Sequence, residues 1–150
     1  MNKIKLLCSI ILMLSIVAMT IGLMLYNGII LFNNPSVEIY PVKGIDVSAY
    51  QGEIDWEVLA KQDILFAYIK ATEGSSYVDE YFNTNFENAN KTNLKVGAYH
   101  FFSYDSSGLA QAENFINTAE KRDDSMPPVI DIEFYGDKET NLPNAEETRN

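Results

Sequence analysis

Two carboxylates, Asp131 and Glu133, interrupt an apolar run that begins at Pro127. Valine and isoleucine favour strands and prolines fix where a strand begins, so residues 128–134 are predicted to form a short buried strand. Residues i and i+2 of a strand share a face, about 6.5 Å apart at ~3.3 Å of rise per residue. This separation is close to that of the carboxylate pairs that cleave glycosidic bonds, and two acids are costly to bury for packing alone. The alternative is an ordinary strand end whose acids are solvated or bind a cation.

The distribution of charge excludes several other kinds of site. The chain has 150 residues and a net charge of -10, and residues 41–150 carry nine basic and twenty acidic side chains. No basic surface is available for phosphates, so we expect no nucleic acid partner. Cys8 is the only cysteine and lies in the N-terminal apolar run, which leaves no thiol for a catalytic or metal site beyond that run. His100 is the only histidine and, with strand parity opposite to Tyr99, is predicted to be packed and hydrogen-bonded.

Residues 6–32 are predicted to form a transmembrane signal anchor. The first twenty of them carry no charge, and twenty residues of helix span about 30 Å, the thickness of the hydrocarbon core of a bilayer. Lys3 and Lys5 precede the run, so residues 1–5 are expected in the cytoplasm and the chain beyond a linker at 33–42 outside the cell. No small-residue cleavage site follows the run, which favours an uncleaved anchor over a cleaved signal peptide.

The remaining residues, 43–150, alternate between strand patterns and helical patterns. The predicted strands are Lys43–Val47, Phe66–Ala71, Lys95–Phe102 and Pro128–Phe134. Between them, Asp55 and either Ser106 or Ser107 can cap helices. The apolar side chains predicted to face the core from these helices are Trp56, Leu59, Phe82, Phe86, Ala89, Leu109, Ala112, Phe115, Ile116 and Ala119.

This alternation predicts an α/β fold built from parallel βαβ units. The units recur every 25–30 residues, close to the ~31 residues expected when a barrel of ~250 residues is divided among eight units. About 110 residues accommodate four units, so residues 43–150 are expected to be a (β/α) barrel truncated to about its first four βα units. A small open α/β domain is the alternative.

Polar and aromatic residues gather where these strands end, which is where parallel α/β folds place their sites. They are Asp46, Tyr50, Gln51, Lys70, Glu73, Tyr99, Phe101, Asp131 and Glu133. Aromatic faces stack on sugar rings while acids act on the linkage, so the set suits a carbohydrate.

Four motifs in order give the segment from Lys43 to Phe134 a resemblance to a known family. They are Gly44-Ile45-Asp46-Val47-Ser48 with Gln51-Gly52 and Ile54-Asp55-Trp56, then Lys70-Ala71-Thr72-Glu73-Gly74, Gly97-Ala98-Tyr99-His100-Phe101 and Val129-Ile130-Asp131-Ile132-Glu133. The segment resembles the first half of the catalytic domain of glycoside hydrolase family 25 lysozymes, the Chalaropsis-type N-acetylmuramidases. The resemblance implies a modified β/α barrel that hydrolyses the β-1,4 bond between N-acetylmuramic acid and N-acetylglucosamine in peptidoglycan glycan strands, without a metal or other cofactor.

By this resemblance, Glu133 is the general acid, with a pKa raised by burial or by the charge of Asp131. Asp131 orients the substrate's N-acetyl group or stabilises an oxocarbenium-like state, and Asp46 binds substrate or acts electrostatically. Tyr99 would contact a sugar ring, although a core tyrosine is also consistent with its position. The other expected substrate contacts are Tyr50, Gln51, Lys70, Glu73 and Phe101. A structural ion pair or hydrogen bond is as consistent with Gln51, Lys70 and Glu73 as a substrate contact.

Two alternatives compete with an enzyme. The family has a further acidic residue and aromatic motifs in its second half, so this chain could instead be an inactive, membrane-anchored glycan-binding module or a remnant half-barrel. Alternatively, Asp46, Asp131 and Glu133 could bind Mg²⁺ or Ca²⁺, which prefer oxygen ligands, in a hydrolase of another type.

Overall fold

The structure is a computed structural model that describes residues 3–26, 36–120 and 122–149. The chain forms two compact units, Met1–Pro41 and Val42–Asn150, which are described separately below.

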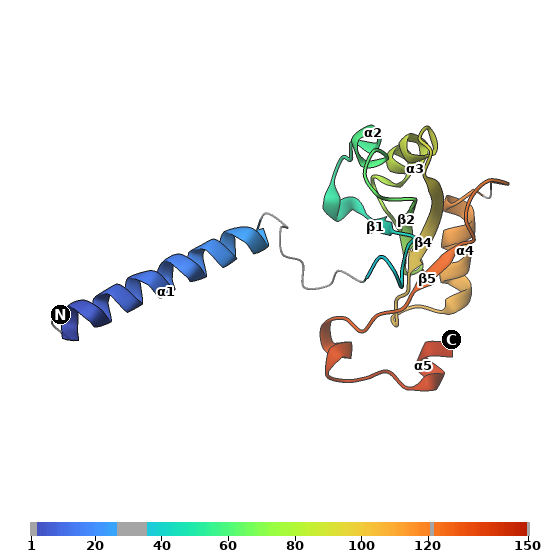
Figure 1. Cartoon of the computed structure of the whole chain (residues 1–150). Helices are drawn as coiled ribbons and strands as arrows, with labels where there is room; N and C mark the ends of the chain where they lie inside the picture. Colours follow the sequence, from blue (N-terminus) through green and yellow to red (C-terminus); the bar gives the residue numbers. More distant parts are fainter. Residues whose placement is uncertain (1–2, 27–35, 121, 150) are drawn as a thin grey trace. The chain divides into compact units, whose positions relative to one another are not determined.

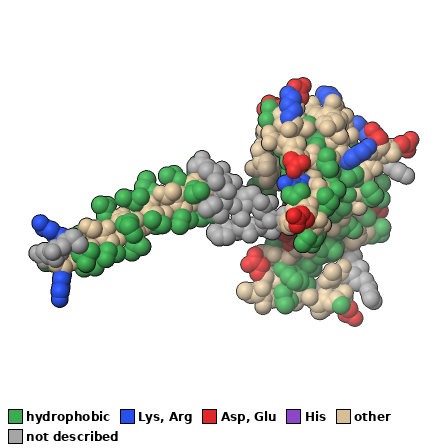
Figure 2. Space-filling view, in the orientation of Figure 1, with side chains coloured by type: hydrophobic (Ala, Val, Ile, Leu, Met, Phe, Trp, Pro, Cys, Tyr) green, Lys and Arg blue, Asp and Glu red, His purple; other side chains and the backbone are tan. Residues whose placement is uncertain are grey.

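The first unit contains the helix α1 (Lys3–Tyr26), which has 24 residues and buries none of them. Apolar side chains surround it, and its lysines lie at the N-terminal end (Figure 2). Its length is about 36 Å at 1.5 Å per residue. With a mean hydropathy of 2.6, α1 is long and apolar enough to cross a membrane, a property that it shares with signal sequences. Residues 27–32 of the predicted span lie outside the described residues.

The serine and threonine side chains of α1 are hydrogen-bonded within the helix. The hydroxyls of Ser9, Ser15 and Thr20 each donate to the carbonyl four residues earlier, at 2.9, 3.0 and 2.9 Å respectively. A hydroxyl bonded in this way exposes little unpaired polarity, so these residues are compatible with an apolar environment.

The second unit is built on a sheet with strand order β1-β2-β4-β5, whose neighbouring strands run parallel (Figure 1). A short strand, β3, pairs antiparallel with the end of β2 and has no counterpart in the sequence prediction. The strands are β1 (Gly44–Val47), β2 (Phe66–Glu73), β3 (Tyr77–Val78), β4 (Lys95–Phe101) and β5 (Val129–Asp131).

Helices connect the parallel strands, as the alternating pattern predicts. They are α2 (Trp56–Leu59), α3 (Phe82–Asn90) and α4 (Gly108–Thr118), with α5 (Ala145–Arg149) near the C-terminus and 3-10 turns η1 (Ala49–Gln51) and η2 (Gly136–Glu139). The predicted caps are present: the Asp55 side chain accepts from the backbone N–H of Val58, and Ser107 accepts from that of Ala110.

The two faces of the sheet carry different side chains because strand residues alternate. One face packs against the helices and forms the core, to which α3 contributes Phe82, Phe86 and Ala89. The strand residues of this core are Val47, Ala67, Ile69, Ala71, Val96 and Ala98. The opposite face carries polar and aromatic residues, with Asp46 opposite Tyr68 and Lys70 opposite Tyr99 in the strand register.

Two predictions about buried residues are wrong. The strand predicted at 128–134 is shorter, and it is not buried: Ile130 of β5 is 64% exposed, because β5 is the edge of the sheet. On α4, Leu109 and Ile116 are 72% and 70% exposed, and Ala112 is also exposed. The inward side of α4 instead runs through a buried glutamine, Gln111, to Phe115 and Ala119.

Candidate active site

A cavity of about 320 Å³ lies on the polar face of the sheet. Its walls come from β1, β2, β4, β5 and the residues that follow β5. They are Asp46, Tyr68, Tyr99, Val129, Ile130, Asp131, Ile132 and Glu133. This volume is within the range of about 300–1,000 Å³ that small-ligand sites occupy.

Four of the predicted site residues meet in this cavity: Asp46, Tyr99, Asp131 and Glu133. The reason for their proximity differs in part from the sequence argument. β5 ends at Asp131, so Glu133 lies beyond the strand, and strand alternation alone does not determine where its carboxylate points. Glu133 is exposed and Asp131 is half-buried.

The surroundings of Asp131 in the cavity shift its pKa. Burial raises the pKa of this carboxyl above its ordinary value, the negative charge of Asp46 raises it further, and the positive charge of Lys70 lowers it. Two carboxylates that share a cavity disfavour each other's ionised form. The fold therefore increases the proton affinity of Asp131.

Tyr99 is 8% exposed. Its pKa is raised, mainly by burial and then by the negative charges of Asp46, Asp131 and Asp79, while a hydrogen bond with Ser48 opposes the shift. The phenol therefore stays protonated at neutral pH, so Tyr99 can donate a hydrogen bond into a cavity that also contains three carboxylates.

Tyr50 and Gln51 do not line the cavity. They belong to η1, where Gln51 forms a capping box: its Oε1 accepts from the backbone N–H of Ser48 at 2.8 Å. Tyr50 is 94% exposed. The structure thus gives Gln51 the hydrogen-bonding role that the sequence left open, and it places Tyr50 in solvent beside the site.

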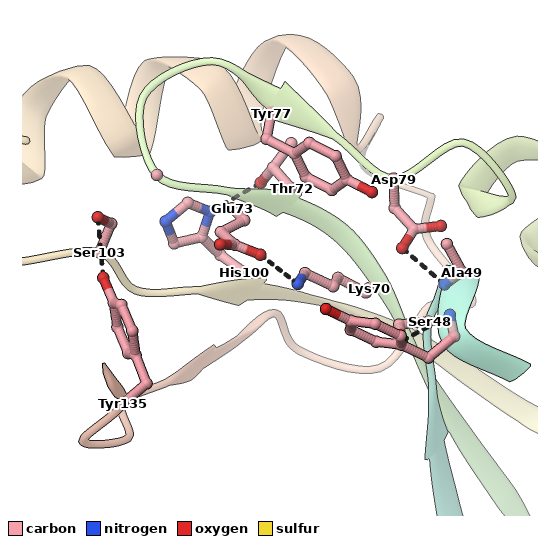
Figure 3. A network of polar contacts seen from close by, with 12 residues as sticks. Ser48, Ala49, Lys70, Thr72, Glu73, Tyr77, Asp79, His100, Ser103 and Tyr135 are labelled. Carbon is pink, nitrogen blue, oxygen red and sulfur yellow. Dashed lines mark hydrogen bonds and ion pairs between the residues drawn. The ribbon is translucent and has the colours of Figure 1, made fainter. Parts of the chain in front are cut away.

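Lys70 and Glu73 lie next to each other (Figure 3), and with Phe101 they form a cluster that is separate from the cavity lining. Lys70 is 6% exposed and makes an ion pair with Glu73. Its ammonium lies 4.7 Å from the centre of the Phe101 ring. Glu73 also borders a second polar cavity of about 240 Å³, between the β2–β3 turn and the loop after β4.

Sequence reasoning missed two residues that shape the site. Tyr68 lines the cavity, and its hydroxyl donates to the carbonyl of Pro127 at 3.0 Å. Strand alternation could have identified it, because Tyr68 is two residues before Lys70 on β2. Asp79 is 3% exposed, and its carboxylate accepts from the backbone N–H of Ala49 at 2.8 Å (Figure 3). No sequence pattern indicated this link between η1 and the segment after β3.

His100 is packed and hydrogen-bonded, as predicted. It is 5% exposed, with Nδ1 2.7 Å from the Thr72 hydroxyl and Nε2 2.9 Å from Oε1 of Gln111. The Gln111 amide nitrogen donates to the carbonyls of Ser103 and Ser106, so its oxygen must be the acceptor and His100 Nε2 the donor. The ring lies on the helix side of the sheet and takes no part in the cavity.

Other parts of the second unit are less suited to acid–base chemistry than the cavity around Asp131. A larger cavity of about 610 Å³, lined mainly by apolar side chains of α3, β4, α4 and the segment 122–128, contains none of the predicted site residues. Among the described residues, no group of three or more histidine, cysteine or acidic side chains is arranged to hold a metal ion.

Comparison with known proteins identifies the family. The sequence profile of glycosyl hydrolases family 25 matches residues 45–150. The chain belongs to this family. The resemblance inferred from the four motifs is therefore confirmed, and the family's α/β fold with a parallel sheet agrees with the strand order described above.

Individual relatives cover the same part of the chain. A family 25 glycosyl hydrolase structure from Bacillus anthracis is 57% identical with a TM-score of 0.69, and the match covers 71% of this chain and 49% of that one. Lysozyme M1 of Streptomyces globisporus is 46% identical, with 61% of this chain and 33% of the relative covered. The protein YegX of Escherichia coli K12 is 41% identical over 65% of this chain and 38% of its own length. The chain thus spans between a third and a half of these relatives.

Proposed function

We propose that this protein is a peptidoglycan hydrolase, an N-acetylmuramidase that cleaves the β-1,4 bond between N-acetylmuramic acid and N-acetylglucosamine. The observation that supports this most is the cavity in which Asp46, Asp131 and Glu133 meet beside the Tyr99 ring. The name of Lysozyme M1, a relative at 46% identity, adds support.

Each polar group has a distinct role in this proposal. Glu133 protonates the glycosidic oxygen as the bond breaks, so that the leaving sugar departs as a neutral alcohol. Asp131 orients the N-acetyl group of the substrate or stabilises the oxocarbenium-like state, and Asp46 adds negative charge on the same side. Tyr99 donates a hydrogen bond and presents its ring to the sugar. Attack by the substrate's own N-acetyl oxygen and direct displacement both fit this arrangement.

The test is release of reducing sugar ends from peptidoglycan by the full chain in detergent solution. Glu133→Gln should lower the rate by about 10²–10⁴-fold, the usual contribution of a positioned acid, and Asp131→Asn should also lower it strongly. Glu57→Gln, on the exposed side of α2, is the matched control and should retain full activity. Unchanged hydrolysis by Glu133→Gln would refute the acid role.

As part of the same proposal, residues 43–150 form the first four βα units of a (β/α) barrel, and its catalytic face is the polar face of the sheet.

One observation favours a second candidate function, that of a glycan-binding module without hydrolysis. Ile130, Ile132 and Phe134 are 64%, 54% and 52% exposed along the edge formed by β5 and the residues after it, so the cavity is open on that side. Retention of the wild-type chain on peptidoglycan, with no release of reducing ends, would support this second candidate.

We also propose that α1 anchors the protein in the cell membrane with the second unit on the cell-wall side. Residues 1–5 would be cytoplasmic, 6–32 would form the anchor, 33–42 would be a linker and 43–150 the partial catalytic domain. The support is the apolar surface of α1 and the lysines at its N-terminal end. An anchored chain should resist alkaline carbonate extraction and be cut by protease added to intact spheroplasts. Recovery of a chain that lacks α1 would contradict the uncleaved anchor.

A further inference from the structure

The Lys70–Glu73 ion pair exists because of an irregularity in β2. Residues three apart on a regular strand point to opposite faces. The pairing between β2 and β4 shifts between Lys70 and Thr72, since Lys70 pairs with Tyr99 while Thr72 pairs with His100. The extra residue is Ala71, a β-bulge that reverses the parity of everything after it. The bulge therefore brings Glu73 onto the face of Lys70 and sends Thr72 to the helix side, where it meets His100.

Lys70 is an unusual residue for the position that it occupies. A lysine is rarely this buried unless its charge is paired, and the carboxylate that pairs with it belongs to a side chain that is 41% exposed. The remainder of its surroundings is aromatic, with the ring centres of Phe101 and Tyr77 at 4.7 and 5.7 Å from the ammonium. Ring faces attract a cation without neutralising it. Much of the positive charge of Lys70 is therefore available to other groups nearby.

The cavity extends across the sheet from β1 to β5, on the face that also carries Lys70. Phe101 of β4 pairs with Glu73 of β2 on one side and with Asp131 of β5 on the other. β4 is therefore the one strand that lies between Lys70 and β5. The titratable groups that line the cavity with Asp131 are Asp46 from β1, Tyr68 from β2, Tyr99 from β4 and Glu133 after β5, and none of them is a cation.

We propose that Lys70 is a positioning residue of this site: it supplies positive charge that favours the ionised form of Asp131 among its neighbouring acids, and the Ala71 bulge and Glu73 hold it in place. The inference rests on the proposed function for its role in catalysis, but the electrostatic link can be measured without any hydrolysis. It assigns to Lys70, with Glu73 as its ion-pair partner, an electrostatic role within the protein instead of contact with the glycan.

The experiment is an NMR titration of the Asp131 carboxyl in the full chain, ¹³C-labelled at aspartate and held in detergent micelles. Two strand spacings put the charges about 10 Å apart, and a dielectric constant between ~20 and 80 then gives about 0.3 to 1.2 pH units. Lys70→Met should raise the titration midpoint of Asp131 by that amount, because the methionine keeps the apolar stem and removes the charge. Glu73→Gln should not raise it, because the Lys70 cation remains.

Lys43→Met is the matched control, because Lys43 forms a comparable ion pair with Asp63 on the surface before β1. It should leave the Asp131 midpoint unchanged. If Lys70→Met destabilises the fold, the double variant Lys70→Met/Glu73→Gln leaves no unpaired buried charge, and it should raise the midpoint as well.

An unmoved midpoint in the Lys70 variants, or an equal rise in Glu73→Gln alone, would overturn the proposal, because the pair would then act only through local structure. In an active preparation, Lys70→Met should also move the acidic limb of the pH–rate profile upward by the same amount. If the wild-type chain hydrolyses nothing but Lys70→Met still raises the Asp131 midpoint, the proposed function is refuted and the electrostatic inference stands.

Discussion

Gln111→Met should destabilise the second unit by about 2–4 kcal/mol. Gln111 is 2% exposed, and its amide makes four hydrogen bonds: from His100 Nε2 and the Ser103 N–H at 2.9 Å each, and to the carbonyls of Ser103 and Ser106 at 2.7 and 2.8 Å. Each such bond contributes about 1 kcal/mol net. Methionine has a similar volume, so little of the loss would come from a cavity. Water can reach the half-buried loop and replace some bonds, which sets the lower bound.

The assay is urea unfolding of the full chain in detergent, followed by the fluorescence of Trp56. Trp56 is the only tryptophan, it is 3% exposed, and its indole N–H donates to Asn85 at 3.0 Å. The signal therefore reports the second unit alone. At slopes of about 1–3 kcal/mol per M, a loss of ~3 kcal/mol lowers the urea midpoint by about 1–3 M.

The matched control for this measurement is Gln62→Met, since residue 62 is exposed. It should change the free energy of unfolding by less than about 0.5 kcal/mol. A loss below about 1 kcal/mol for Gln111→Met would show that the loop after β4 is held by other contacts, and the account of this network would be wrong.

Three further substitutions test other parts of the fold. Gly97→Ala would place a Cβ 2.3 Å from the Tyr68 ring, so we expect a loss of about 1–3 kcal/mol from overpacking and a displaced cavity wall, measured by urea unfolding. Asp79→Asn would set an NH₂ group against one of the two backbone N–H donors now 2.8 and 3.0 Å from the carboxylate, and should cost about 1–3 kcal/mol in the same assay. The raised pKa of Asp131 means that its contribution to stability is present below its ordinary value of 3.8 and is lost as the pH rises through the folded value. Asp131→Asn should therefore be slightly more stable than wild type at pH 7, by less than about 1 kcal/mol after screening by solvent, and the difference should vanish near pH 3; a less stable variant at pH 7 would contradict the unfavourable proximity of Asp46.

The sequence predicted the order of strands and helices because each apolar pattern is local. It predicted less well wherever a polar residue packs in the core. The inward side of α4 begins at Gln111, and a hydropathy pattern treats a glutamine as exposed, so the pattern assigned Leu109 and Ile116 to the core in its place. The four hydrogen bonds that make Gln111 an acceptable core residue come from chain segments that the helix pattern does not include.

The site was predicted from strand parity, and it departs from the prediction where parity is broken. Regular alternation puts Lys70 and Glu73 on opposite faces, while the bulge at Ala71 puts them together. An alanine such as Ala71, between Lys70 and Thr72, carries no signal for a bulge, which glycine would have given. Glu133 is the converse case, because the strand ends before it and its position in the cavity comes from the following backbone.

The two faces of the sheet separate stability from chemistry. The helix side buries the apolar core and the satisfied polar groups of His100 and Gln111, so changes there should alter the free energy of unfolding. On the cavity side, burial and then the negative charge of Asp46 raise the proton affinity of Asp131, so this carboxylate is ionised there at some cost to stability. Lys70 offsets part of that cost from within the sheet. This explains why a lysine occupies a buried position in β2 where an apolar residue would pack more easily, and why its removal should change the titration of Asp131 in addition to the stability of the fold.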